Sequence, residues 1–372
     1  MSRPARPTIL FMYLGRFGAL GRFTYELAEA AQEASDLDLR FMVSSNNEDA
    51  EVLKSAVPGL LTLPTFHKPT PQALLLGYFR ARRELAAILD RVRPAAVVNL
   101  MPHVWSPLLA ATVKRRGCRF ISVIHDAVPH PGDNTAYLTR WLLRDAHAAD
   151  RIVTLSDAVT STLLAQGRFA PGRIDTLFHP DLRFASNGAV RTRREGAPLR
   201  VLFFGRIMAY KGLEVYAEAI AKLRDAGFAV EPGVAGSGRI PSETRELLHR
   251  LGAEVENSWI PNEKITSILD RYDSVVCAHL EASQSGVAAT AFGHAMPVVA
   301  LPTGGIVEQV KDRETGILAT RVTPSALADA IAQLANTPGL YDSISRNLAS
   351  TAPRRSMNHF LDRIAGVALA GA

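Results

Sequence analysis

The stretch VLFFGRIMAYKGLEVYAEAI, residues 201–220, runs from apolar residues through a glycine into a helical pattern. The apolar run is typical of a buried strand, and Arg206 and Lys211 follow Gly205 where the strand gives way to the helix. A helix start attracts anions because its free N–H groups and its dipole point outward. An arginine can bind two phosphate oxygens at once, and a lysine adds a compact charge. The stretch therefore predicts either a diphosphate clamp or two exposed basic residues around a helix start.

The alternation of strand and helix extends over the whole chain. Apolar strand-like runs occupy residues 8–14, 37–44, 95–100, 119–126, 151–156, 199–205, 228–236, 274–280 and 297–301. Helical patterns lie between them, and such alternation indicates parallel sheets covered on both faces. The polar, basic segment 185–198 reads as a linker. We predict the α/β class, with two doubly wound, Rossmann-like parallel-sheet domains at residues 1–184 and 199–352.

Length and composition agree with two domains. The chain has 372 residues, of which 47% are apolar and 21% charged, as in ordinary globular proteins. Cys118 and Cys277 lie in separate halves within apolar runs, which favours reduced thiols over a disulfide framework or a zinc site. The first apolar run reads as a strand rather than a signal peptide, and no apolar stretch reaches the ~20 residues needed to cross a bilayer. We expect a cytoplasmic protein.

Basic residues concentrate in the first half of the chain. YFRARRELAAILDRVRP, residues 78–94, carries five arginines, and KRRGCR, residues 114–119, carries one lysine and three arginines. One interpretation is a solvated helix face. The other is attraction to an anionic surface, either a membrane leaflet or an acceptor with phosphates, which would give peripheral contact with the inner face of a membrane. Nucleic acid is disfavoured because exposed aromatic residues are not interleaved with these arginines.

Ligands of doubly wound sheets bind beyond the carboxyl ends of the strands. Gly15 and Gly18 follow the first strand, and His125 comes at the end of the fourth. In the second half, Gly205 and Gly236 follow the first two strands. These positions are candidates for a binding site.

A second anion-binding turn is predicted in SQSGVAATAFGHAMPVVALPTGGIVEQV, residues 283–310. Ser283, Ser285 and Gly286 precede a predicted helix over residues 287–295, whose free amides could hold a phosphate or a sugar hydroxyl.

Four motifs together resemble glycosyltransferase family 4, the nucleotide-sugar enzymes with the two-domain GT-B fold. They are FGRIMAYKGLE, VAGSG, WIPNEKITSILDRYDSVVC and SGVAATAFGHAMPVVALPTGGIVEQV. Their order and spacing agree with the family over about residues 155–310, and the first half agrees in its layout and in the motif IHD. In such enzymes the C-terminal helix, here within residues 353–372, crosses back onto the N-terminal domain.

The resemblance implies roles for single residues. Arg206 and Lys211 would neutralise the donor diphosphate, Glu263 would lie near the nucleotide base, and His125 and Glu281 would position the donor sugar. The implied catalytic residues are Arg206, Lys211, His125 and Glu281. The implied donor-binding residues are Gly15, Gly18, Gly205, Gly236, Glu263, Ser283, Ser285, Gly286, Val287 and Thr290.

One departure from the family concerns a pair of glutamates spaced eight residues apart. Counted without gaps from Pro297, the second position falls on Thr290 and the first on Ala282, beside Glu281. The second glutamate normally holds the nucleotide ribose, so the ribose contact is in doubt, whereas the diphosphate clamp is unaffected.

The resemblance implies a retaining glycosyltransferase that uses a UDP- or GDP-sugar as substrate and needs no cofactor. The expected acceptor is a saccharide or polyprenyl-linked saccharide of a bacterial surface polysaccharide. We expect no metal, because a basic clamp offsets the leaving-group charge and the metal-like string at residues 36–38 (DLD) lies at the wrong end of the sheet. The alternatives are a nucleotide-sugar epimerase or phosphorylase of the same fold, and a non-catalytic polyanion- or membrane-binding protein with a decayed donor site.

Overall fold

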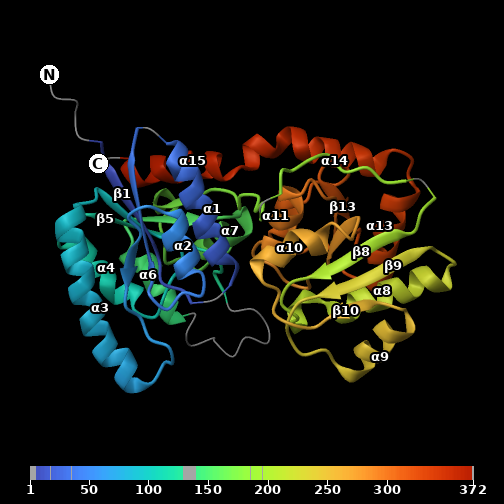
Figure 1. Cartoon of the computed structure of the whole chain (residues 1–372), viewed down its shortest axis with the longest axis horizontal. Helices are drawn as coiled ribbons and strands as arrows, with labels where there is room; N and C mark the ends of the chain where they lie inside the picture. Colours follow the sequence, from blue (N-terminus) through green and yellow to red (C-terminus); the bar gives the residue numbers. More distant parts are fainter. Residues whose placement is uncertain are drawn as a thin grey trace. The chain divides into compact units, whose positions relative to one another are not determined.

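The computed structural model describes residues 6–16, 18–34, 36–128, 140–184, 186–194 and 196–370. Its described residues form two compact units: the first contains the chain up to Phe178 together with the part from Met357 on, and the second contains His179–Ser356. Figure 1 shows helices and strands in both units. Both sheets are parallel wherever strands pair, as the strand–helix alternation predicted.

Within its described residues the first unit has one seven-stranded sheet with the order β3-β2-β1-β4-β5-β6-β7. Its strands are β1 Thr8–Tyr13, β2 Asp38–Ser44, β3 Leu61–Leu63, β4 Ala96–Asn99, β5 Arg119–Ile124, β6 Arg151–Thr154 and β7 Ile174–Thr176. Its helices are α1 Ala19–Glu33, α2 Ala50–Ala56, α3 Pro71–Val92, α4 Ser106–Lys114, α6 Arg144–Ala148, α7 Asp157–Ala165 and α15 Met357–Leu369. The helical pattern expected between β5 and β6 lies partly outside the described residues; within the described part, residues 140–142 and α6 are helical.

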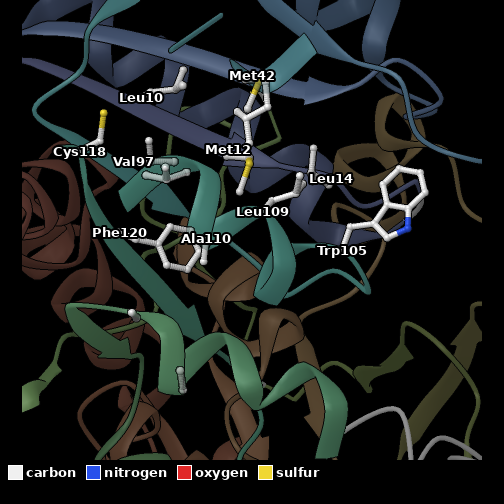
Figure 2. Packing of buried hydrophobic residues seen from close by; sticks show 14 of the residues in the cluster. Leu10, Met12, Leu14, Met42, Val97, Trp105, Leu109, Ala110, Cys118 and Phe120 are labelled. Carbon is white, nitrogen blue, oxygen red and sulfur yellow. The ribbon is translucent and has the colours of Figure 1, made fainter. Parts of the chain in front are cut away.

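The core of this unit lies between the sheet and its helices. Figure 2 shows Met12 of β1 and Leu14, just after that strand, close to Leu109 of α4, with Phe120 of β5 nearby. The strands are apolar on both faces because helices cover both sides of a doubly wound sheet. Ser156 caps α7, since its side chain accepts a hydrogen bond from the Val159 amide at 3.3 Å.

The C-terminal helix α15 packs within the first unit. Phe360 is fully buried and meets the ring of Phe23 in α1 edge-on, with 5.4 Å between the centroids. Figure 1 shows the red α15 beside the blue α1. The Arg119 guanidinium also donates to the Ala368 carbonyl at 2.9 Å. The last segment of the chain therefore completes the first unit.

Within its described residues the second unit has one six-stranded sheet with the order β10-β9-β8-β11-β12-β13. Its strands are β8 Leu199–Phe204, β9 Val230–Ala235, β10 Glu254–Glu256, β11 Ser274–Cys277, β12 Val298–Ala300 and β13 Gly316–Leu318. Its helices are α8 Leu213–Asp225, α9 Ser242–Arg250, α10 Asn262–Leu269, α11 Gly286–Gly293, α12 Ile306–Gln309, α13 Pro324–Asn336 and α14 Leu340–Thr351.

The basic segment expected to be a linker packs on the second unit where it is described. The Arg191 amide donates to the Ser345 hydroxyl at 2.7 Å, and the Arg191 guanidinium donates to Asp270 at 3.1 Å and to the Tyr272 carbonyl at 2.9 Å. Arg191 is therefore a hydrogen-bonded anchor, whereas composition alone suggested an open loop.

In the metal-like string at residues 36–38, the last residue, Asp38, has a structural role. Asp38 begins β2, accepts a hydrogen bond from the Thr8 hydroxyl at 3.1 Å and pairs with Arg40 at 2.8 Å. No group of His, Cys, Asp and Glu side chains suited to a metal is found among the described residues. In the same described part of the chain, no helix is long and apolar enough to cross a membrane.

Candidate functional site

The candidate clamp lies where β8 ends in the second unit. Arg206 is exposed and follows Gly205, which adopts a positive φ of 102°. Lys211 closes a short 3-10 turn, Ala209–Lys211, directly before α8. The Lys211 ammonium donates to Nε2 of His279 at 2.7 Å, and His279 is buried. An ammonium can only donate, so His279 is neutral with its proton on Nδ1, and the imidazole holds the charged end of Lys211 in place.

Loops from three neighbouring strands approach closely around this clamp. Gly212, with φ 70°, lies so near the loop after β11 that an added Cβ would come well within 3.0 Å of the Ala278 carbonyl oxygen. Gly236, after β9, lies equally close to the Gly205 carbonyl. Only glycine permits such contact between backbones. The sequence predicted Gly205 and Gly236 as site residues, and the structure brings them together at the carboxyl edge of the sheet.

The N-terminus of α11 offers free backbone donors. The Ser285 hydroxyl accepts from the Ala288 amide at 3.2 Å, which caps the helix. The Gln309 side chain holds Ser285 from both sides, since it accepts from the Ser285 amide at 2.6 Å and donates to the Ser285 carbonyl at 3.3 Å. Among the described residues no acceptor contacts the amides of Gly286 and Val287. Two N–H groups at the positive end of a helix are suited to an anion.

Cys277 links the clamp to this helix start. Its Sγ lies 3.8 Å from the Ser285 hydroxyl, and burial raises the pKa of the Cys277 thiol to about 11. The Ser285 hydroxyl and the Lys211 ammonium both act against that rise in pKa. The positive charge of Lys211 therefore acts on Cys277, which contacts the α11 cap Ser285. Gly205, which precedes Arg206, also packs close to the Val287 side chain, so the clamp and the start of α11 lie side by side.

The other candidates of the second unit differ in exposure. Glu263, in the first turn of α10, and Glu281, after β11, are exposed, and Ser283 is half-buried. Thr290 is only 4% exposed, and its hydroxyl donates to the Gly286 carbonyl at 2.8 Å. The structure therefore commits the hydroxyl proton of Thr290 to its own helix, so this hydroxyl could meet a ribose only as an acceptor.

The candidates of the first unit lie after β1 and β5. The Gly18 amide donates to Glu48 at 3.2 Å, and Gly15 packs against the ring of Tyr13. Nε2 of His125 donates to the Leu100 carbonyl at 2.8 Å, because a carbonyl can only accept. Burial lowers the pKa of His125, although this hydrogen bond opposes the shift. His125 is therefore neutral near pH 7 and would act as a hydrogen-bonding group rather than a cation.

Two family models match the chain. Residues 20–179 match the model described as Glycosyltransferase Family 4, and residues 198–337 match the model described as Glycosyl transferases group 1. The chain belongs to glycosyltransferase family 4. Members of this family transfer a sugar from a nucleotide-sugar donor.

Relatives of this glycosyltransferase align over different shares of its length. D-inositol 3-phosphate glycosyltransferase of Corynebacterium glutamicum is 30% identical over 44% of this chain, and the match spans only 42% of that relative. Alpha-D-kanosaminyltransferase of Streptomyces kanamyceticus is 24% identical over 77% of this chain and 78% of that protein. A crystal structure of Anabaena HepE in complex with UDP superimposes with a TM-score of 0.73 and 15% identity, covering 97% of this chain and 99% of that one. These neighbours establish the GT-B fold.

Sequence reasoning missed two residues that support the site of this glycosyltransferase. His279 holds Lys211, and Gln309 holds Ser285, over separations of 68 and 24 residues. The only signal was their place after β11 and at the end of α12, because residues that follow neighbouring parallel strands meet at one sheet edge. No periodicity marks such pairs.

Proposed function

We propose that this family 4 glycosyltransferase moves a sugar from a UDP- or GDP-sugar to a hydroxyl acceptor, with retention of configuration and without a metal ion. The observation that carries the proposal is the combination of Arg206, Lys211 and the free amides of Gly286 and Val287 at one sheet edge of the second unit. A nucleoside diphosphate needs this kind of charge compensation when it departs. The second unit is thus the donor unit in our proposal, and the first unit binds the acceptor.

Charge stabilisation would supply most of the catalysis. The bond between the sugar's anomeric carbon and the phosphate oxygen breaks, and its electron pair goes to that oxygen. Arg206 can bind two phosphate oxygens, while Lys211 is held in position by His279 before the donor arrives. Preorganised donors aimed at developing charge are usually the largest catalytic contribution.

In the proposed mechanism the acceptor hydroxyl attacks from the face that the diphosphate leaves, and this front-face attack retains the configuration. The departing phosphate oxygen then takes the hydroxyl proton, so no side-chain base is needed. In this proposal the neutral His125 and the exposed Glu281 orient the sugar, Glu263 lies near the base, and Gly15 and Gly18 let the first loop approach the phosphates.

Two further features are proposed for the biological setting. The acceptor is a saccharide or a polyprenyl-linked saccharide, since the first unit is rich in arginine. The buried free thiols of Cys118 and Cys277 suit a reducing compartment, which supports a cytoplasmic reaction.

A donor screen tests the proposal. The full chain is incubated with UDP-, GDP- and ADP-sugars, release of the nucleoside diphosphate is measured, and NMR reports the anomeric configuration of the first product. We expect turnover of a UDP- or GDP-sugar with retained configuration. An inverted product would contradict the mechanism, and conversion of the donor sugar to an epimer without an acceptor would favour the epimerase.

A further inference from the structure

A basic hollow of about 320 Å³ lies in the first unit. It is formed where α3 packs beside α4, two helices that Figure 1 shows as neighbours. Its lining residues are Phe79, Arg82, Arg83 and Ala86 of α3, and Thr112, Arg115 and Arg116 at the end of α4.

Three of the four arginines of this hollow lack a counter-charge. Arg116 is neutralised, because its guanidinium donates to both carboxylate oxygens of Asp90 at 2.8 and 3.2 Å. The guanidinium groups of Arg82, Arg83 and Arg115 make no hydrogen bond or ion pair with any described residue. A hollow lined by charges of one sign attracts counter-ions, so this cluster favours an anion.

Thr112 gives a second, independent indication of a ligand. The residue is 2% exposed and lines the hollow, and among the described residues its hydroxyl has no hydrogen-bond partner. A buried hydroxyl without a partner is rare in native proteins, so each case needs an explanation. An anionic oxygen in the hollow would accept this hydrogen bond and contact the arginines.

Large apolar side chains extend the hollow along α3. Leu75, Leu76 and Phe79 are 61%, 68% and 54% exposed. The spacing of residues 76, 79 and 83 places them on one stripe of the helix, apolar at its start and basic further along. The residues of α3 that pack into the core are others: Ala81, Leu85, Ile88 and Leu89. The exposed stripe is therefore not needed for folding.

We propose that this face of α3 and α4 binds a membrane surface of anionic phospholipids. A lipid phosphate occupies the hollow, held by Arg82, Arg83, Arg115 and the Thr112 hydroxyl. Leu75, Leu76 and Phe79 enter the boundary between headgroups and acyl chains, as apolar residues of interfacial helices do. A soluble phosphate would not need the leucines, and single-stranded nucleic acid would need several aromatic platforms rather than one. The proposal goes beyond the donor chemistry and does not rest on it.

Vesicle co-sedimentation tests the charged part of the site. The full chain should bind vesicles of phosphatidylcholine with phosphatidylglycerol and should not bind pure phosphatidylcholine. Each arginine near such a surface contributes about fivefold, so Arg82→Gln/Arg83→Gln/Arg115→Gln should weaken binding roughly 100-fold. The matched control is Arg140→Gln/Arg144→Gln/Arg168→Gln, which removes the same charge from the hollow beside α6 in the same unit. An equal loss in the control would overturn the site in favour of non-specific attraction.

Two further variants test the phosphate contact and the source of the anion. Thr112→Val should weaken vesicle binding about fivefold, the value of one hydrogen bond, and should leave the melting temperature unchanged or higher because it removes an unpaired buried hydroxyl. Phe79→Trp should show tryptophan quenching by brominated lipids beyond that of the wild type. No added quenching would overturn the membrane assignment. The same holds if glycerol 3-phosphate abolishes vesicle binding and Leu76→Ser leaves it unchanged, because that result would show a soluble phosphate ligand. Donor hydrolysis is measured without vesicles in every variant. A failure of the membrane-binding proposal can therefore be distinguished from a failure of the proposed reaction.

Discussion

Gly212→Ala probes the contact that positions the clamp. Gly212 has φ 70°, and a Cβ there would come well within 3.0 Å of the Ala278 carbonyl oxygen, directly before His279. Gly227, at the other end of α8, has φ 74° with nothing within 4 Å of an added Cβ. Gly227→Ala therefore carries only the strain of a left-handed alanine, whereas Gly212→Ala also forces two backbones apart.

The structure sets the size of both effects. A left-handed alanine costs about 1–2 kcal/mol, and overpacking adds about 1–3 kcal/mol at Gly212 only. In a unit of this size, 1 kcal/mol corresponds to roughly 2–4 °C in melting temperature. To reach ordinary contact beyond 3.4 Å, the backbones must separate by on the order of 1 Å, and a displacement of that size can cost about 100-fold in rate.

The assay pairs thermal unfolding with donor turnover for the two variants. Gly227→Ala should melt a few degrees lower and keep wild-type turnover. Gly212→Ala should melt lower still and lose most of its turnover, because Lys211 and His279 move apart. Equal turnover in the two variants would refute the reasoning that this contact positions the clamp.

Three further predictions concern metal, the ribose and pH. Donor turnover should persist in EDTA; full loss that manganese or magnesium restores would contradict charge compensation by the clamp. Thr290→Val should keep its UDP affinity in calorimetry, because the hydroxyl already bonds within α11; a loss of about fivefold, the value of one neutral hydrogen bond, would place the ribose against it. His103 lies between β4 and α4 in the first unit, and desolvation there lowers its pKa to about 4. Unfolded chains therefore bind more protons than folded ones between about pH 6.5 and 4, and about 3 kcal/mol of stability should be lost as the pH falls through that range. Urea unfolding of His103→Gln should show a shallower decline, and an unchanged decline would assign it to other groups.

The regular elements were largely predictable from local patterns. The long apolar runs became β1, β2, β5, β8 and β9 within a residue or two of the expected bounds. The strands missed were β3, β7, β10 and β13, each only three residues long. β12 is equally short but was predicted, because it lies within the longer apolar run 297–301. The four missed strands pair at the edges of the sheets, where the neighbouring strand rather than the local sequence determines the structure.

The candidate site was predictable in its placement but not in its contacts. The strand–glycine–helix pattern located Arg206 and Lys211, since it marks a carboxyl end of a parallel strand. Nothing local indicates that His279 would hold Lys211, because that hydrogen bond depends on β8 and β11 being neighbours. Likewise, counting back from Pro297 reached Thr290 without revealing that its hydroxyl turns back to its own helix.

The most direct test of the diphosphate clamp is turnover of the best donor by Arg206→Gln and Lys211→Gln. The matched control is Lys222→Gln, which removes one charge from the far end of α8. Each clamp variant should lose on the order of 100-fold in turnover with an unchanged melting temperature, as expected when one donor to developing charge is removed, and the control should match the wild type. Near-normal turnover by both clamp variants would contradict the assignment of Arg206 and Lys211 to the leaving diphosphate.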